Sequence, residues 1–157
     1  MQTQIGITQE HLSEIAHSLN IFLSDEHVLY IKTRNAHWNI EGGDFFAMHK
    51  FFEGQYQELE EVIDNVAERI RMLGHYPVAT MQGFLNLTHL TEKMREKNNS
   101  EGFIQTLLED HQSIIMHLRH GIREIADQLD DAGSSDFLNG LIEKHEKIAW
   151  MLRAHLA

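Results

Sequence analysis

Residues 44–73 have the sequence DFFAMHKFFEGQYQELEEVIDNVAERIRML, and this stretch decides the fold class. Apolar side chains recur along it every three or four residues, which is the spacing of one face of an α-helix. Gly42 and Gly43 break the chain before it, Asp44 can cap it, and Gly74 can end it. We therefore expect a long amphipathic helix whose apolar face packs in a core. That face consists of Phe45, Met48, Phe52, Tyr56, Leu59, Ile63, Val66, Ile70 and Leu73.

Three further stretches share this helical spacing, and a looser connection at residues 75–99 separates the second helix from the third. The connection contains the single proline and a short predicted helix, Met81–Leu90. Long helices joined by one crossover between parallel neighbours are typical of a four-helix bundle. We expect an all-α fold with a short helix in the long connection between helices 2 and 3. The other predicted helices run from Thr8, as cap, to Ala36; from Glu101, after Asn99 or Ser100, to Leu129; and from Ser134 or Ser135, as cap, to near His155.

Length and composition narrow the class of protein. The 157 residues suffice for a single domain, residues 1–157, with a hydrophobic core. Without cysteine, the chain has no disulfide, thiolate metal site or catalytic thiol. Its net charge of −11 argues against binding nucleic acid by neutralising phosphates. No apolar run approaches the roughly 20 residues of a membrane span, and residues 1–10 lack the pattern of a signal peptide, so the expected location is the cytoplasm.

A second face of the 44–73 helix carries side chains that bind metals. His49, Glu53, Asp64 and Glu68 fall on one arc beside the apolar face. Carboxylates together with an imidazole suit iron, manganese or zinc. A solvated acidic face would have the same composition, and the arc alone leaves that alternative open.

The spacing along this helix favours the metal site. His49 and Glu68 lie about 28 Å apart and Glu53 and Asp64 about 16 Å apart, so one helix cannot bring all four to one ion. The two pairs share a midpoint between residues 58 and 59, however. Two copies that run antiparallel across a two-fold axis at that point would pair His49 with Glu68 and Glu53 with Asp64. Such a dimer would contain two equivalent sites.

A second imidazole, His37, ends the first predicted helix, and an antiparallel second helix would bring its start close to this end. The cluster could then hold one or two ferrous ions. A di-iron centre inside one bundle is disfavoured, because it needs two Glu-x-x-His pairs and the chain has one, Glu14 with His17. The predicted cluster takes its residues from two chains: His37, His49 and Glu53 from one, Asp64 and Glu68 from the other.

These residues also carry a resemblance to a known family. Ala36-His37-Trp38-Asn39, Phe45–Lys50 and Asp64–Ile70, with the C-terminal stretch Asp136–Leu152, resemble the Dps family, the DNA-binding proteins from starved cells or mini-ferritins. The resemblance covers nearly the whole chain. It implies a ferritin-like bundle, a hollow dodecamer, and ferroxidase centres at two-fold interfaces. There Fe²⁺ would be oxidised, preferably by hydrogen peroxide, and stored as Fe³⁺, which protects the cell from oxidative stress.

The resemblance also assigns residues. By position, the catalytic iron ligands would be His37, His49, Asp64 and Glu68. The remaining ligand is usually Asp in the family and here is Glu53, whose extra methylene keeps the charge and changes the reach of the carboxylate. Zinc or manganese could occupy the same site.

Two further roles follow from the resemblance. Trp38 and Trp150 would absorb oxidising equivalents near the centre, although packing in a core or an interface explains them as well. Carboxylates near the start of the fourth helix would line three-fold pores through which iron passes, although turn or cap aspartates are common there. The candidates for the pores are Asp127, Asp131 and Asp136, with Asp130 as the alternate to Asp131.

The remaining histidines show no convergent spacing. His117 and His120 lie three residues apart on one predicted helix and could bind a stray divalent ion. We expect the others to be surface or packing residues: His11, His17, His27, His75, His89, His111, His145 and His155.

The family name raises an alternative function, a nucleoid-associated protein that compacts DNA without a major ferroxidase role. Family members that compact DNA use a lysine-rich terminal extension, whereas here no Lys or Arg precedes Lys32 and only Arg153 lies near the C-terminus. Twelve copies at −11 each would repel DNA at neutral pH, unless divalent ions bridge the charges or acid protonates the histidines. We expect weak or no direct DNA binding.

Overall fold

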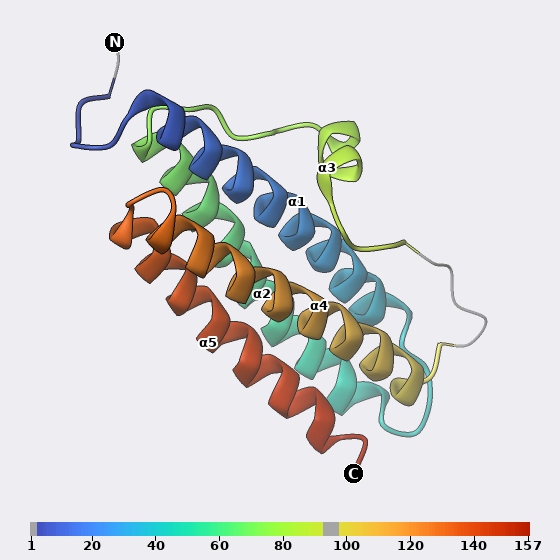
Figure 1. Cartoon of the computed structure of the whole chain (residues 1–157). Coiled ribbons are helices and arrows are strands. Elements are labelled where there is room, and N and C mark those ends of the chain that lie inside the picture. The colour runs from blue at the N-terminus through green and yellow to red at the C-terminus, as the bar shows by residue number, and fades with distance from the viewer. Residues whose placement is uncertain (1–2, 93–97) are drawn as a thin grey trace.

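The chain folds into four long helices and one short helix (Figure 1). The computed structural model describes residues 3–92 and 98–157, and no strand occurs among them. The predicted all-α bundle, with a short helix in the long connection, is confirmed. The helices are α1 (Gln9–Asn39), α2 (Phe45–Met72), α3 (Met81–Leu87), α4 (Ser100–Asp127) and α5 (Ala132–Ala154).

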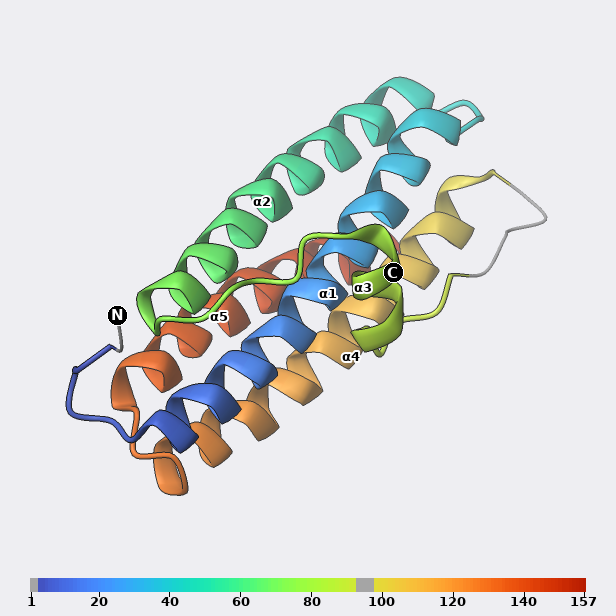
Figure 2. The ribbon, with the colours of Figure 1, turned by 90° about the horizontal axis from the view of Figure 1, so that it is seen from above.

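The long helices pack as two antiparallel pairs, α1 with α2 and α4 with α5. The connection after α2 returns along α1, and α3 lies on this return (Figures 1 and 2). The return makes α2 and α4 parallel, as the long connection predicts. Residues 93–97 of that connection lie outside the described part of the chain. Within the described part, no helix is both long and apolar enough to cross a membrane.

Several predicted helix ends are correct to within a few residues. Thr8 caps α1, since its hydroxyl accepts a hydrogen bond from the His11 N–H at 3.2 Å. Gly74 follows α2 with a φ of 87°, which glycine adopts without strain. α1 continues past the predicted end at Ala36 to Asn39. The helix therefore includes His37, which was expected at its end.

The predicted cap of α5 is wrong. Asp131, rather than Ser134 or Ser135, caps this helix, because its carboxylate accepts a hydrogen bond from the Ser134 N–H at 3.0 Å. The same carboxylate lies 3.5 Å from the Arg69 guanidinium of α2. Asp131 is therefore buried and binds the start of α5 to the end of α2.

The predicted end of α3 at Leu90 is also wrong, because the helix stops at Leu87. A buried carboxylate in the middle of α1 explains this. Asp25 accepts hydrogen bonds from the Thr88 hydroxyl and the His89 N–H, both at 2.7 Å. These bonds pull the chain out of helical geometry after Leu87 and fasten it to α1.

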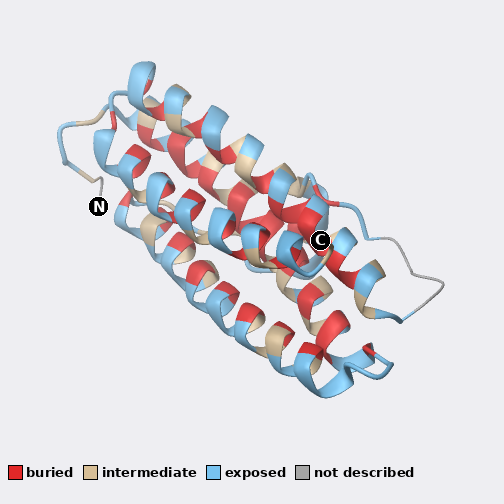
Figure 3. Cartoon of the chain, turned by 90° about the horizontal axis from the view of Figure 1, so that it is seen from below, coloured by how far each residue is buried: buried red, intermediate tan, exposed pale blue. Residues whose placement is uncertain are grey.

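The core lies where the inner faces of the four long helices meet (Figure 3). Most of the apolar face predicted for α2 is buried, including Phe52 and Leu59. Phe45 is an exception, with 44 % of its surface exposed, because it stacks on His49 in the first turns of α2 instead of turning inward.

A chain of three buried polar side chains crosses this core. The imidazole Nε2 of His145 donates to the Glu26 carboxylate at 2.8 Å, and Nδ1 of His145 lies 2.9 Å from Nδ1 of His111. Burial, and to a smaller extent the neighbouring His145, holds the pKa of His111 well below its ordinary value of 6.5. His111 and His145 are packing residues, as expected, and the pairing of α4 with α5 brings them into contact, which their spacing in the sequence does not indicate.

We expect the free energy of unfolding to fall as the pH drops below about 6.5, in part because of His111. The unfolded imidazole takes up a proton there and the buried one does not, so stability is lost by up to about 1.4 kcal/mol per pH unit. Urea denaturation at fixed protein concentration, over a series of pH values on both sides of that point, measures the slope. His111→Leu should flatten it, and the exposed control His17→Leu should leave it unchanged. A His111→Leu slope equal to that of the unmodified protein would contradict this explanation.

Candidate metal centre

Two imidazoles meet where α1 ends and α2 begins. A short turn reverses the chain there, and Gly42 adopts a φ of 131° in it, a conformation that side chains disfavour. His37 from the last turn of α1 then stacks on His49 from the first turns of α2. Their ring centroids are 3.8 Å apart and the ring planes differ by 21°. The prediction that an antiparallel pair would bring these two histidines together is confirmed.

Each of these rings bonds to the backbone of the other residue. Nδ1 of His37 lies 2.8 Å from the His49 carbonyl, and Nδ1 of His49 lies 2.8 Å from the His37 carbonyl. A carbonyl oxygen only accepts, so both Nδ1 atoms carry the proton. In the neutral rings both Nε2 atoms therefore hold a free lone pair, which is the form in which histidine binds a metal.

The end of α1 leaves the carbonyl of His37 available. A helix leaves its last four carbonyl groups without helical partners. The Ile40 N–H closes the last helical bond, to Ala36, whereas the Glu41 N–H bonds to the Asn98 carbonyl. The carbonyl of His37 is thus left for the imidazole of His49.

Glu53 places a carboxylate one turn further along α2. Its oxygen lies 2.6 Å from the Lys50 ammonium. The hydrogen bond from Lys50 and its charge hold the pKa of Glu53 below its usual value, and His37 and His49 contribute in the same direction. Glu53 is therefore ionised at neutral pH and lies within the electrostatic reach of both imidazoles.

Aromatic rings surround the two histidines. Tyr56 meets His37 edge to face at 5.1 Å between centroids, and Phe45 stacks on His49 at 5.2 Å. The sequence places Tyr56 only on the core face, but its ring is partly exposed and borders the site. Its position two turns after His49 on the same helix is the signal that could have identified it.

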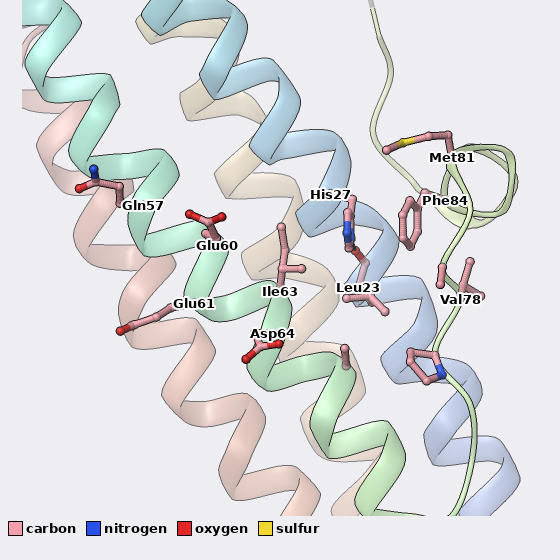
Figure 4. A pocket seen from close by; sticks show the side chains of 13 residues that line it. Leu23, His27, Gln57, Glu60, Glu61, Ile63, Asp64, Val78, Met81 and Phe84 are labelled. Carbon is pink, nitrogen blue, oxygen red and sulfur yellow. Dashed lines mark hydrogen bonds between the residues drawn. The ribbon is translucent and has the colours of Figure 1, made fainter.

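Asp64 and Glu68 lie elsewhere on α2, and both are exposed. Asp64 borders a hollow of about 790 Å³ between α2, α1 and the segment before α3 (Figure 4). Measured along the helix, Asp64 is about 22 Å and Glu68 about 28 Å from His49. One chain therefore presents two separate groups: a histidine half-site (His37, His49 and Glu53) and an acidic half-site (Asp64 and Glu68).

Both tryptophans are exposed in the single chain. Trp38 has 58 % and Trp150 has 63 % of its surface accessible. Trp38 directly follows His37, and the Arg34 guanidinium lies 5.0 Å from the centroid of its ring. Neither tryptophan is packed in the core of the chain, which leaves an interface or a redox role for them.

The aspartates near the start of α5 differ in exposure. Asp127 and Asp136 are exposed, and so is Asp130, the alternate for the middle position. Asp131 is buried as the cap of α5. Free carboxylates for a pore are therefore available at Asp127, Asp130 and Asp136.

One cluster escapes the sequence patterns entirely. Asp25, His89 and His117 bring a carboxylate and two imidazoles within 4.8 Å of one another. His89 lies at the surface, as expected, but its ring meets the ring of His117, so His117 converges with His89 as well as having His120 on its own helix. The three residues lie far apart in the sequence, so no local spacing could reveal them.

Comparison with known proteins places the chain among ferritin-like structures. Residues 16–157 match the family of the ferritin-like domain. A low temperature-induced protein of Nostoc is 40 % identical over 97 % of this chain and 85 % of its own length. A "DNA protection during starvation protein" of Bacillus anthracis is 38 % identical over 91 % of this chain and 97 % of its own length. The Vibrio cholerae Dps structure, described as a member of a superfamily of ferritin-like diiron-carboxylate proteins, superimposes with a TM-score of 0.92 at 31 % identity, covering 99 % of this chain and 97 % of that one.

The ion pair of Lys50 with Glu53 yields a test of the histidine half-site. Lys50→Gln frees the carboxylate and removes a positive charge beside the two imidazoles, so Co²⁺, used as an air-stable substitute for Fe²⁺, should bind more tightly. The expected gain is up to about five-fold, the size of an exposed ion pair. Isothermal titration measures the affinity. Arg119→Gln is the matched control, because it removes one charge from the exposed pair with Glu146 between α4 and α5. Weaker Co²⁺ binding by Lys50→Gln would disprove the assignment of Glu53.

Proposed function

Because this chain belongs to the ferritin-like family and, within it, to the Dps group, we propose that it is a ferroxidase that stores iron. It oxidises Fe²⁺, preferably with hydrogen peroxide, and keeps the Fe³⁺ inside a dodecameric shell. Two ferrous ions give two electrons to one peroxide, which takes up two protons and leaves as two water molecules. The reaction consumes Fe²⁺ and hydrogen peroxide, the two reactants that cause peroxide damage. It therefore protects the cell from oxidative stress.

The observation that carries this proposal is the reciprocal pair of hydrogen bonds between His37 and His49. They fix two imidazoles with both Nε2 lone pairs free. Iron would bind to these atoms and to Glu53, and the carboxylates of Asp64 and Glu68 from a second copy would complete the centre. Zinc and manganese suit the same donors and would compete for the site.

Two features of the single chain support this division of the ligands. In each chain, His49 of one half-site and Glu68 of the other lie about 28 Å apart along α2. The pairs His49–Glu68 and Glu53–Asp64 share one midpoint on this helix. Met81 lines the hollow beside Asp64, Ile31 and Leu85 line a neighbouring hollow that Met81 also borders, and all three side chains are exposed in the single chain. A second copy that covers them across a two-fold axis would remove apolar surface from water and join the half-sites at the same time.

Further parts of the chain fit an iron-storing shell. Asp127 and Asp136, with Asp130, would concentrate cations at pores near the α4–α5 turn. Trp38, beside His37, and Trp150 would take up oxidising equivalents that escape the centre. The whole chain, residues 1–157, would act as one ferritin-like domain in the cytoplasm.

A second candidate function, protection of DNA by direct binding, comes from the names of relatives such as the Bacillus anthracis protein. The net charge of −11 per chain counts against it, because phosphate binding requires a local excess of Lys and Arg. We therefore assign to this chain protection through iron chemistry, with direct DNA binding weak or absent.

Two inactive variants should regain activity when they assemble together. His37→Ala/His49→Ala removes the histidine half-site, and Asp64→Ala/Glu68→Ala removes the acidic half-site. Each variant alone should oxidise Fe²⁺ at least about ten-fold more slowly. In a mixed assembly, about a quarter of the sites should be intact, since half of random dimers are mixed and each has one complete site of two. Stopped-flow oxidation with peroxide, and with oxygen for comparison, measures the rate, and size exclusion verifies the assembly.

The control for this mixing experiment is a chain with His49→Ala and Asp64→Ala, which damages both half-sites. It should be inactive alone and should restore nothing in combination with either variant. If verified mixed assemblies of the two double variants stay inactive, the ligands do not come from two chains. If His49→Ala/Asp64→Ala oxidises Fe²⁺ as fast as the unmodified protein, the assignment of the site fails.

We expect the assembled protein not to shift supercoiled plasmid in a gel at neutral pH without divalent ions. The reason is repulsion between the phosphates and the negative charge of each chain. Adding Mg²⁺, or lowering the pH to protonate histidines, should increase retention. Stoichiometric retention at neutral pH without metal would favour direct DNA protection instead.

A further inference from the structure

A buried carboxylate joins α1 to the segment that follows α3. Asp25 has no exposed surface. One of its oxygens accepts hydrogen bonds from the Thr88 hydroxyl and the His89 N–H, both at 2.7 Å. The other oxygen lies 3.3 Å from Nδ1 of the His89 ring. The carboxylate therefore has one oxygen fully used by the backbone and hydroxyl, and one directed at an imidazole.

A second imidazole approaches the same place from α4. The ring centroids of His117 and His89 are 4.0 Å apart. Nδ1 of His117 is buried and has no hydrogen-bond partner in the described part of the chain. A buried polar atom without a partner is costly, and native proteins usually satisfy it with water or an ion. Donor atoms of Asp25, His89 and His117 all lie within 4.8 Å of one another.

A cavity adjoins these donors. It has a volume of about 340 Å³, and both His89 and His117 contribute to its wall. His120 and Glu124 from α4 line the same cavity, with 3.8 Å between Nδ1 of His120 and the Glu124 carboxylate. The cavity has room for water molecules beside His89 and His117, and it adds further nitrogen and oxygen groups near them.

We propose that Asp25, His89 and His117 bind a divalent first-row transition-metal ion. Two imidazoles and one carboxylate form a ligand set that suits Fe²⁺ and Zn²⁺, and three protein ligands leave positions for water on the cavity side. An ion there would bind Nδ1 of His117, which has no hydrogen-bond partner among the described residues. It would also bind the Asp25 oxygen that accepts no hydrogen bond from Thr88 or the His89 N–H. It would also tie α1, α4 and the segment after α3 to one point.

This site is separate from the proposed ferroxidase centre. Asp25 and His37 lie twelve residues apart on α1, which is about 18 Å along the helix. The two sites share no residue. All three ligands of the second site come from one chain, so it needs no second copy to be complete.

The test is Co²⁺ titration followed by absorption spectroscopy in the assembled protein. All samples carry His37→Ala and His49→Ala, so that the other site does not contribute to the signal. This background should bind one Co²⁺ per chain with an intense visible band. Adding His89→Gln or His117→Gln should weaken that binding at least about ten-fold. Adding the control His17→Gln, at an exposed position of α1, should leave it unchanged.

A second measurement keeps the test independent of folding defects. Zn²⁺ should raise the thermal unfolding midpoint of the His37→Ala/His49→Ala background, because an ion that binds only the folded state stabilises it. The midpoint with EDTA shows whether His89→Gln and His117→Gln fold, and Zn²⁺ should no longer raise it in these variants. The proposal is overturned if the background binds no Co²⁺, or if binding and the Zn²⁺ effect persist after both histidine substitutions.

Discussion

The contact between the end of α1 and the start of α2 is the constraint on which the rest of the site depends. A short turn with Gly42 in a conformation that favours glycine reverses the chain, and His37 then faces His49. Each ring donates to the carbonyl of the other residue, so two hydrogen bonds connect the helices and orient both rings. The same bonds determine which nitrogen carries the proton. One local geometry therefore joins two helices and orients the two histidines that are proposed as metal ligands.

Sequence patterns predicted the features that repeat along one helix, and missed those that depend on contacts between helices. The helical period located the four long helices, and their antiparallel order was enough to pair His37 with His49. The helical period could not place Asp25 beside His89 and His117, because the contact among these residues depends on the path of a long connection. The cap of α5 was mistaken for a related reason. Asp131 is held both by the Ser134 N–H and by Arg69 of α2, and the second contact is invisible in the local sequence.

The interior of the bundle explains why the iron chemistry is proposed at its surface. Three of its buried polar side chains already bind one another, with His145 between Glu26 and His111. One carboxylate and two linked imidazoles do not supply the paired Glu-x-x-His set that a bundle-centred di-iron site requires. Asp64 and Glu68, the carboxylates proposed for the centre, are exposed on α2. A centre built from them must borrow ligands from a neighbouring copy.

Charge then links the proposed oxidation to assembly. Within one chain, the histidine half-site offers two imidazoles, which supply no negative charge, and a carboxylate that Lys50 already neutralises. Such a set attracts a divalent ion weakly, and a trivalent ion gains little from it. Asp64 and Glu68 of a second copy would add two negative charges, which stabilise Fe³⁺ more than Fe²⁺ because attraction grows with the charge of the ion. In the proposed centre, the driving force for losing an electron therefore appears only where two copies meet. The acidic face of α2 would thus serve the redox step as well as the binding of iron.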